Sequence, residues 1–493
     1  MKIRLQNIGI VKESTISIDG LTVITGKNNS GKTTVGKTLY SLIDATANIL
    51  SKSRVDRAQY ISKKLDDILE DMDFLRFVFR AYEFDEKDDE LACSYLSKFS
   101  HLKFLLSGEY RHDIPLLEIE SFARNLYEDL TNIDVQLFCD EVVSKFGTRY
   151  AFAKDKKQNK EKTEIFIRDC FKKVQSMLEE LFVKLSKDPQ LIDYTRESIN
   201  QTLRTEFAGQ IQPAKIDVDY SKIELFNEDT LCFDIKIAGN KVLNENKPVF
   251  LASPYKKTYF IDDPYIVDDT TTSRRNSRMQ ISDEPDSFLK PNNIVPHNFK
   301  LKYVLRSKPN PSILEQTFLN DALQKIKEEI SKIIPGTFEF SNAGDYYVQN
   351  GKKLKVSNLA TGSKMFSIIK ILLEKGELDK STLLVLDEPE AHLHPQWQNN
   401  FAEMIVLLVK ELGVNILLTT HSSNFVLALD AYMRKYQIQH LTNFYQTKFS
   451  SDEMVEYECV NENMNDIYND FLQYLSEVKM LRDYIIRNAG ETE

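Results

Sequence analysis

A short glycine-containing motif near the N-terminus limits the folds open to this chain more than any other feature. Residues 26–33 read GKNNSGKT and match the pattern G-x-x-x-x-G-K-[ST]. An apolar run, Leu21 to Ile24, precedes the motif and a helical pattern follows it, which predicts strand, loop and helix in that order. The glycines let successive backbone N–H groups point at phosphate oxygens, and the helix N-terminus adds partial positive charge. The motif therefore predicts an α/β fold with a site for nucleotide phosphates.

Two side chains of the motif have specific expected roles. Lys32 is expected to reach the β- and γ-phosphates, and the Thr33 hydroxyl to ligate Mg²⁺. The predicted phosphate site comprises Gly26, Asn28, Asn29, Ser30, Gly31, Lys32, Thr33 and Thr34.

Two later apolar runs end in polar residues that suit the same chemistry. The run 383–387 ends at Asp387, whose carboxylate is expected to hold the Mg²⁺ hydration shell. The next residue, Glu388, is placed to polarise an attacking water as general base. The run Asn415–Thr420 leads into His421, which is expected to hydrogen-bond the γ-phosphate and the water, although a lone histidine is more often structural. Lys32, Glu388 and His421 are the predicted catalytic residues.

Composition narrows the class of protein. The chain has 493 residues, of which 42% are hydrophobic, so intrinsic disorder of the whole chain is excluded. The chain has 64 Lys and Arg and 74 Asp and Glu, a formal net charge of −10. This charge argues against coating nucleic acid through bulk positive charge and leaves contact that is local or made through a partner. The five cysteines form no C-x-x-C pair and predict free thiols in a reducing compartment. With no signal-peptide pattern and no membrane-length apolar run, we expect a cytoplasmic protein without a membrane partner.

Turn signals predict two hairpins. Asp19-Gly20 separates two alternating apolar runs near the N-terminus, and Asn350-Gly351 divides the segment 336–356. A third pattern, His392-x-His394, suggests a metal site, but no carboxylate or thiol cluster completes it, so a structural turn is favoured.

The order of four motifs carries a resemblance. GKNNSGKT, LATGSK, LLVLDEPEAHLHP and TTHS follow one another as in the ABC-type ATPase head, and more narrowly as in its SMC/RecF/OLD branch. The resemblance implies ATP and Mg²⁺ as cofactors and a head-to-tail dimer or higher homo-oligomer. It makes Leu359–Lys364 the signature loop, with Thr361, Gly362 and Ser363 contacting the nucleotide of a second subunit, and Glu390–Pro395 a loop that crosses the interface. The sequence departs from the family at Ala360, where a serine is usual, and it offers no clear Q-loop glutamine.

The resemblance also implies the fold class and domain plan. The fold class is an α/β ABC-type ATPase head, with a P-loop and a mixed sheet flanked by helices, split by a large, mainly helical insertion. Positions 32 and 387 are separated by more than a typical domain of roughly 100–200 residues, which requires such an insertion. The expected parts are the N-terminal part of the head (1–50), the helical insertion (51–210), a β-rich part with a mobile loop at 268–296 (211–310), the C-terminal part of the head (311–430) and a tail (431–493).

Size and motif layout resemble ATPase subunits of anti-phage defence systems, the PtuA type of Septu and retron systems first and the AriA type of PARIS second. In those families a separate HNH or Toprim protein carries the nuclease. The expected function is therefore an ATP-hydrolysing switch that controls an effector nuclease. An SMC/RecF-like DNA repair ATPase is the alternative. An OLD-type nuclease is disfavoured because the tail after His421 contains no D-x-D element for a Toprim domain.

Overall fold

The computed structural model describes residues 1–54, 191–244, 249–250, 253–268, 295–307, 334–341 and 344–489, together with single residues and short pieces within 56–67, 121–128, 165–183 and 326–332. By its internal contacts the chain divides into two compact units, one formed by Met1–Ile49 with Ile192–Glu493, and the other by Leu50–Leu191.

One large mixed sheet forms the centre of the first unit. Within the described residues its strand order is β6-β5-β4-β1-β2-β15-β14-β3-β13-β12-β8, with β7 paired to β5. The strands are β1 Lys2–Ile8, β2 Val11–Ser17, β3 Leu21–Thr25, β4 Ser221–Asn227, β5 Thr230–Ala238, β6 Lys241–Val242, β7 Val249–Phe250, β8 Lys257–Ile261, β12 Thr382–Asp387, β13 Asn415–Thr420, β14 Thr442–Phe449 and β15 Val455–Cys459.

The half of the sheet that carries the motifs is parallel. Strands β14, β3, β13, β12 and β8 run in the same direction, with Thr420 opposite Thr25 and Asp387 opposite Thr419. Every residue of β3 is buried, as expected for parallel strands whose two faces are both covered. Because the carboxyl ends of these strands share one edge, the phosphate loop, Asp387 and His421 emerge side by side.

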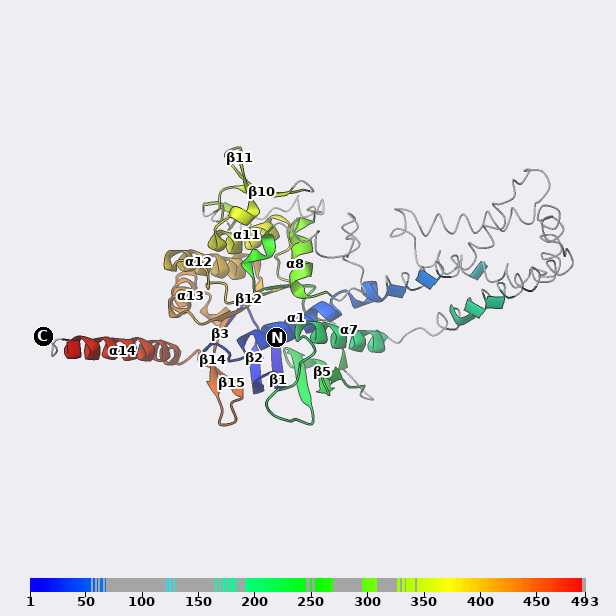
Figure 1. The fold of residues 1–493 in the computed structure, drawn as a ribbon, viewed down its shortest axis with the longest axis horizontal. Coiled ribbons are helices and arrows are strands. Elements are labelled where there is room, and N and C mark those ends of the chain that lie inside the picture. The colour runs from blue at the N-terminus through cyan, green and yellow to red at the C-terminus, as the bar shows by residue number, and fades with distance from the viewer. Residues whose placement is uncertain are drawn as a thin grey trace, which may run out of the picture. The chain divides into compact units, whose positions relative to one another are not determined.

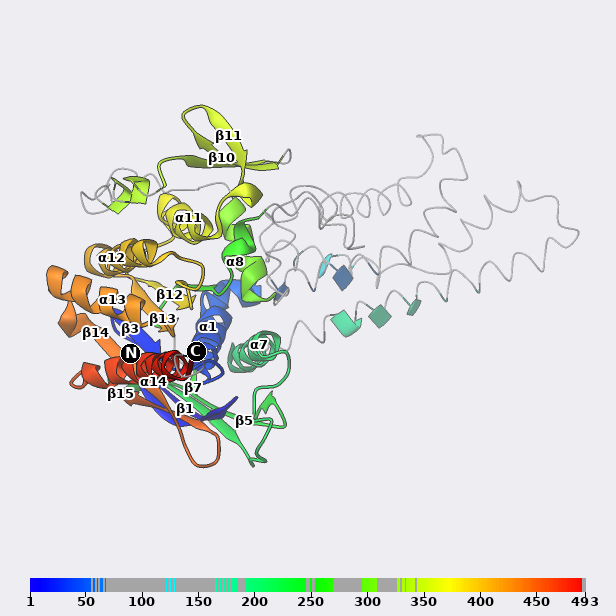
Figure 2. The same cartoon turned by 60° about the vertical axis from the view of Figure 1, so that its left-hand side comes forward.

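Helices cover both faces of the parallel strands. The helices with described bounds are α1 Lys32–Thr46, α7 Leu191–Glu206, α8 His297–Arg306, α11 Thr361–Glu374, α12 Pro395–Leu412, α13 Ser423–Tyr436 and α14 Met464–Ala489. Alternate side chains of β12 point to opposite faces: Leu383 and Val385 pack in the cluster that contains α1, and Leu384 and Leu386 in the cluster that contains α11, α12 and α13. Figures 1 and 2 show α11, α12 and α13 gathered together beside these strands. The predicted α/β fold class is confirmed by this sheet.

The predicted hairpin at Asp19-Gly20 is wrong. Strand β3 does not pair with β2 but lies between β13 and β14, and the hairpin of this region joins β1 to β2, with Ile8 opposite Val11. The run 21–25 is apolar on both faces, so burial favours the interior of the sheet over a hairpin edge.

The predicted turn at Asn350-Gly351 is confirmed. Both residues have positive φ, 51° and 73°, as a two-residue hairpin turn requires. It joins β10 (Gly344–Gln349) to β11 (Lys352–Lys355), and β9 (Thr337–Ser341) adds a third strand to this small sheet.

The expected insertion, 51–210, and the second unit share most of their length. Helix α7 belongs by its contacts to the first unit, where Ile199 and Leu203 are fully buried. Within the second unit the described residues, such as 51–54 and 179–181, are helical. Most of the loop expected at 268–296 lies outside the described residues, so it stays a prediction.

Candidate nucleotide site

Backbone geometry explains why two positions of the phosphate loop are glycine. Gly31 precedes α1 with φ 73°, a left-handed conformation that side chains rarely adopt. A Cβ on Gly26 would lie 1.8 Å from Thr447 Oγ1, which belongs to strand β14. The loop is therefore shaped by strain at one end and by close packing against the sheet at the other.

A pocket opens along this loop. Its volume is about 370 Å³. It is lined by Gly9, Ile10, Asn28, Asn29, Ser30, Gly31, Lys32, Thr33, Thr34, Lys37, Phe207 and Glu388. Most of the predicted phosphate-binding residues therefore share one cavity, together with Ile10, Lys37 and Phe207, which no motif indicated.

The predicted phosphate-binding lysine is held by the loop itself. Lys32 is 4% exposed, and its Nζ donates to the carbonyl oxygens of Gly26 at 3.1 Å and Lys27 at 2.8 Å. Nζ also lies 3.3 Å from Glu388 Oε1. A buried cation at the start of a helix suits an anionic ligand such as a nucleotide phosphate.

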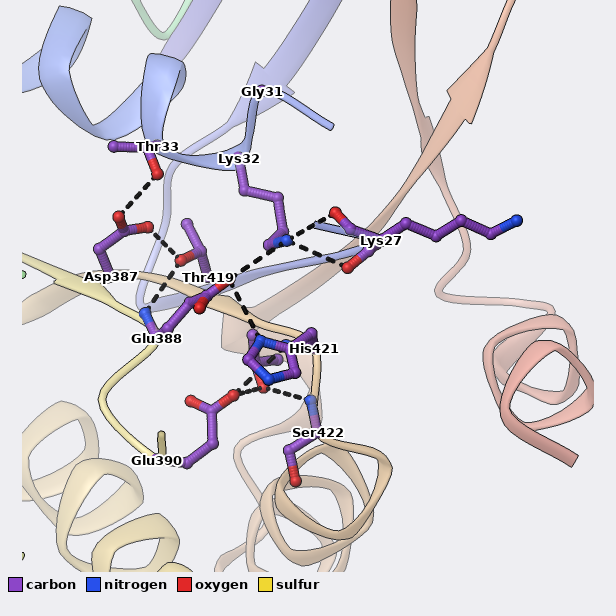
Figure 3. A network of polar contacts seen from close by, with 12 residues as sticks. Lys27, Gly31, Lys32, Thr33, Asp387, Glu388, Glu390, Thr419, His421 and Ser422 are labelled. Atoms are coloured by element: carbon purple, nitrogen blue, oxygen red, sulfur yellow. Dashed lines mark hydrogen bonds and ion pairs between the residues drawn. The ribbon is translucent and has the colours of Figure 1, made fainter. Parts of the chain in front are cut away.

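The expected metal-binding pair is in direct contact. Thr33 Oγ1 donates to Asp387 Oδ2 at 2.7 Å, and Thr419 donates to the other carboxylate oxygen (Figure 3). Burial raises the pKa of Asp387, against the lowering effect of these two hydrogen bonds. A nearby cation would stabilise the charged form. Among the described residues no group of three or more His, Cys, Asp and Glu could hold a metal ion.

These oxygen donors fit the Mg²⁺ that the fold implies. Mg²⁺ is usually held by one or two carboxylates, waters and substrate phosphates, so a hydroxyl and a carboxylate beside a phosphate loop are sufficient protein ligands. Thr33 and Asp387 would hold the ion, which would neutralise charge on the phosphates.

Glu388 lies between the lysine and the histidine. Its backbone adopts a left-handed conformation, φ 48°, and its N–H donates to Thr419 Oγ1 at 3.1 Å. Its Oε1 lies 3.3 Å from Lys32 Nζ and 3.2 Å from His421 Nδ1. The three predicted catalytic side chains are thus brought together (Figure 3).

Glu390 is a site residue for which the sequence predicted no catalytic or binding role. It is 2% exposed, accepts from the Thr420 hydroxyl, and accepts from the His421 backbone N–H at 3.3 Å. Burial raises its pKa, and the hydrogen bond from Thr420 acts in the opposite direction. It holds the backbone on which His421 is mounted. Its position in the sequence DEPEAH, two residues after Glu388, could have indicated a role at the site.

The three predicted signature residues lie apart from the pocket. Thr361, Gly362 and Ser363 form the first turn of α11 and do not line the cavity. Thr361 Oγ1 is 3.0 Å from Tyr265 Oη, and a Cβ on Gly362 would lie 3.0 Å from Leu393. Within one chain, the predicted signature loop therefore packs against the 390–395 loop and does not line the phosphate pocket.

The C-terminal strands also support the site. Tyr457, on β15, is buried and donates from its hydroxyl to the carbonyl of Gly31 at 2.7 Å. Thr447, on β14, fills the space beside Gly26. The sequence placed these residues in a tail and indicated no link to the loop.

His392 and His394 have structural contacts. His394 Nδ1 accepts from the backbone N–H of Gln396 at 3.3 Å at the start of α12, and His392 packs its ring edge-on against Tyr265.

Within the described parts of the chain, no helix is both long and apolar enough to cross a membrane.

Comparison with solved structures finds SMC head domains. The chain is similar to the SMC head domain from Thermotoga maritima, with a TM-score of 0.34 and 9% identity over 93% of this chain and 98% of that chain. It is also similar to an Smc head with an extended coiled coil from Pyrococcus furiosus, bound to the C-terminal domain of ScpA, with a TM-score of 0.30 and 10% identity over 97% and 98%.

Sequence comparisons are more direct. The chain is 29% identical over 102 residues to the Old nuclease of Escherichia phage P2, a match that covers 20% of this chain and only 16% of that protein's length. A family model described as AAA ATPase domain matches residues 1–426, which include every predicted site residue. The chain therefore belongs to the AAA ATPase domain family.

Proposed function

We propose that this chain is the ATP-binding and ATP-hydrolysing switch subunit of a prokaryotic anti-phage defence complex, and that it controls a separate effector nuclease. The observation that carries the proposal is the convergence of five side chains at one edge of the parallel strands. Lys32, Thr33 and Glu388 line one pocket, Thr33 contacts Asp387, and Glu388 contacts His421.

The arrangement supports hydrolysis of the terminal phosphate. The loop and Lys32 bind the phosphates, and Thr33 with Asp387 holds Mg²⁺. Glu388 accepts the proton of the attacking water, and His421, 3.2 Å from Glu388, orients that carboxylate and the water. Slow turnover is expected because Ala360 provides no hydroxyl at the position where the related heads have a serine.

The separation of the predicted signature loop from the pocket supports the proposed dimer. Thr361, Gly362 and Ser363 lie at the N-terminus of α11, where backbone N–H groups suit a phosphate. In a head-to-tail pair this turn covers the pocket of the second copy. Bound ATP then contacts both heads and stabilises the dimer. The second unit, Leu50–Leu191, then transmits the closed state of the heads to the nuclease.

One second candidate has a specific observation behind it. The short match to the Old nuclease of phage P2 supports an OLD-type reading in which the chain itself cuts nucleic acid. An SMC/RecF-like repair ATPase shares the same head and would bind DNA directly.

Copurification separates these candidates. The chain is tagged at its own locus and purified with the products of neighbouring genes, with and without ATP. We expect an HNH or Toprim nuclease to copurify, and its cutting activity to change with the nucleotide present. A Lys32→Ala variant is the matched control and should copurify without responding to ATP. A chain that purifies alone and cuts nucleic acid would overturn the proposal in favour of the OLD-type reading.

A further inference from the structure

A buried histidine joins three separate segments beside the nucleotide site. His297 is the first residue of α8, Glu206 the last of α7, and Asp262 the residue directly after β8. His297 Nδ1 is 2.6 Å from Glu206 Oε2, and its backbone N–H donates to Glu206 Oε1 at 2.8 Å. Its other ring nitrogen, Nε2, forms an ion pair with Asp262 Oδ1 at 3.0 Å.

The environment fixes both the charge and the orientation of this histidine. Burial lowers its pKa, but the contacts with Asp262 and Glu206 outweigh burial and raise the pKa to about 9. A cation thus lies between two carboxylates. The ring of Phe260 packs against the imidazole at 4.4 Å between centroids, and Tyr40 meets it edge-on at 5.8 Å. The ring therefore has little freedom to tilt, and Asp262 is held by a rigid partner.

The register of the sheet places Asp262 at the same sheet edge as Asp387. Strands β8 and β12 are parallel neighbours with Ile261 opposite Leu386, so Asp262 and Asp387 follow at the same edge. Their charges interact, since Asp262 contributes to raising the pKa of Asp387. Lys37 lies one helical turn after Thr33, lines the pocket and lowers the pKa of Asp262. Asp262 therefore lies at the sheet edge that carries Asp387, although it is not among the residues that line the pocket.

We propose that Asp262 is a second carboxylate for the Mg²⁺ of the ATP site, and that His297 and Glu206 are positioning residues that fix it there. The inference rests on the proposed ATPase function. His297 contacts Oδ1 of Asp262, which leaves Oδ2 for the ion or for one of its waters. The Asp262 side chain is 34% exposed, whereas Glu206 on the other side of the ring is 2% exposed. Of the two carboxylates that contact the histidine, Asp262 is thus the one accessible to an ion.

A carboxylate oxygen of Asp262 suits Mg²⁺ as a ligand. Mg²⁺ demands octahedral oxygen coordination and is commonly held by one or two carboxylates with phosphates and waters. Partners that orient a ligand from behind matter almost as much as the ligand, and their loss typically costs about 10–100-fold in metal affinity. No glutamine follows β8; two aspartates do, and the first of them is the one clamped by the histidine.

The test measures metal binding, using Mn²⁺ as a spectroscopic probe in place of Mg²⁺. Free Mn²⁺ is followed by electron paramagnetic resonance in the presence of the full chain and a non-hydrolysable ATP analogue. Asp262→Asn should weaken Mn²⁺ binding by about tenfold or more. His297→Gln should weaken it in the same direction, and Asp262→Glu should restore part of it. Analogue affinity measured in EDTA should stay at the wild-type value in each variant.

Asp263→Asn is the matched control. This neighbour loses the same charge, but its side chain accepts from the Tyr265 backbone N–H at 2.8 Å, which an asparagine can still do. It should bind Mn²⁺ like the wild type. An Asp262→Asn variant that also binds Mn²⁺ like the wild type overturns the inference.

A measurement on the wild-type chain keeps the inference testable if a variant fails to fold. Fe²⁺ bound in place of Mg²⁺ is treated with ascorbate and oxygen, so that the chain is cut near the ion. Cuts are expected near Asp262 as well as near Thr33 and Asp387. Cuts confined to the latter two overturn the role of Asp262 and leave the proposed function intact. Absence of any analogue-dependent metal binding by the wild type contradicts both.

Discussion

At the scale of single residues, the Glu388 carboxylate contacts both Lys32 and His421 in the candidate active site. Glu388 Oε1 is within 3.3 Å of both the Lys32 ammonium and the His421 ring. Its left-handed backbone and the hydrogen bond from its N–H to Thr419 hold the side chain on the pocket side of the strand end. A general base must be oriented before its basicity matters, and here the orientation comes from Lys32 at the start of α1, Thr419 on β13 and His421 directly after β13.

Glu390 provides a prediction about pH. Burial raises its folded-state pKa, so its charge destabilises the folded chain increasingly as pH rises from the unfolded-state pKa through the folded one. Glu390→Gln keeps an acceptor for Thr420 and removes that charge. The variant should therefore unfold at a higher temperature than the wild type at pH 8, with a difference that shrinks towards pH 4.

Glu403 is the control of opposite sign. Burial raises its pKa, but hydrogen bonds from Lys435 and Tyr436 prevail and lower it, so its charge stabilises the fold above the unfolded-state pKa, and this is lost as pH falls. Glu403→Gln should lower the unfolding temperature at neutral pH. If Glu390→Gln lowers it as well, the assignment of Glu390 as a destabilising buried acid is wrong.

Residues within motifs were predictable, and residues that support them from elsewhere in the chain were not. Lys32 and Thr33 begin α1 directly after the phosphate loop, and Asp387, Glu388 and His421 lie at the ends of β12 and β13, so the motif spacing indicates their chemistry. The contact of Thr419 with Asp387 joins two strands 32 positions apart, and the contact of Tyr457 with Gly31 spans 426 positions; spacing along the chain predicts neither contact.

At the scale of elements, the hairpin β14–β15 supports the phosphate loop. Tyr457→Phe removes the hydrogen bond to the Gly31 carbonyl, which should cost about 1 kcal/mol of stability. Because the bond holds the loop, nucleotide affinity should fall by up to about fivefold. Isothermal titration calorimetry with an ATP analogue measures this nucleotide affinity.

Tyr445→Phe is the matched control on the same hairpin. Its hydroxyl accepts from the Ser17 backbone N–H at 2.8 Å, away from the loop. Stability should fall similarly while affinity stays unchanged. Equal losses of affinity in both variants would show that the hairpin affects the pocket only through overall stability.

The start of α11 gives a second prediction at this scale. Ala360 is the N-cap and provides no side-chain hydrogen bond. Ala360→Ser should stabilise the chain by about 1 kcal/mol, as a capping serine does. It should also raise ATP turnover by roughly tenfold or more, because one added hydroxyl donor at an anionic transition state can have this effect.

Ala360→Asp separates these two effects. Aspartate caps a helix as well as serine does, but it brings negative charge and no hydroxyl to the phosphate. It should stabilise the chain without raising turnover, which is measured by phosphate release. Equal turnover in both variants would refute a role for this position in a second subunit's site.

Strand and helix patterns were predictable where a segment is either buried throughout or alternating. The run 21–25 was correctly expected to be a strand, but its partners were not. A turn signal such as Asp19-Gly20 indicates that the chain changes direction, but it does not determine with which strand the following segment pairs. The prediction at Asn350-Gly351 is confirmed because the strands on either side of the turn, β10 and β11, pair directly with each other.

At the scale of the whole molecule, the long spacing between motifs reflects a unit inserted into the head. The contacts place its limits at Leu50 and Leu191, so α7 belongs to the head. The sequence prediction extended the insertion to residue 210 and so included α7 in it. Helix α7 ends at Glu206, which contacts His297 at the start of α8.

The claim that ATP closes two heads is tested most directly by the mass of the Glu388→Gln chain in solution. This variant binds ATP and lacks the proposed general base, so the closed state should accumulate. Light scattering after gel filtration with ATP and Mg²⁺ should give about twice the mass measured without nucleotide, where a single chain is 57.1 kDa. Lys32→Ala should show no shift. If Glu388→Gln binds ATP and its mass does not change, ATP-dependent closure is contradicted.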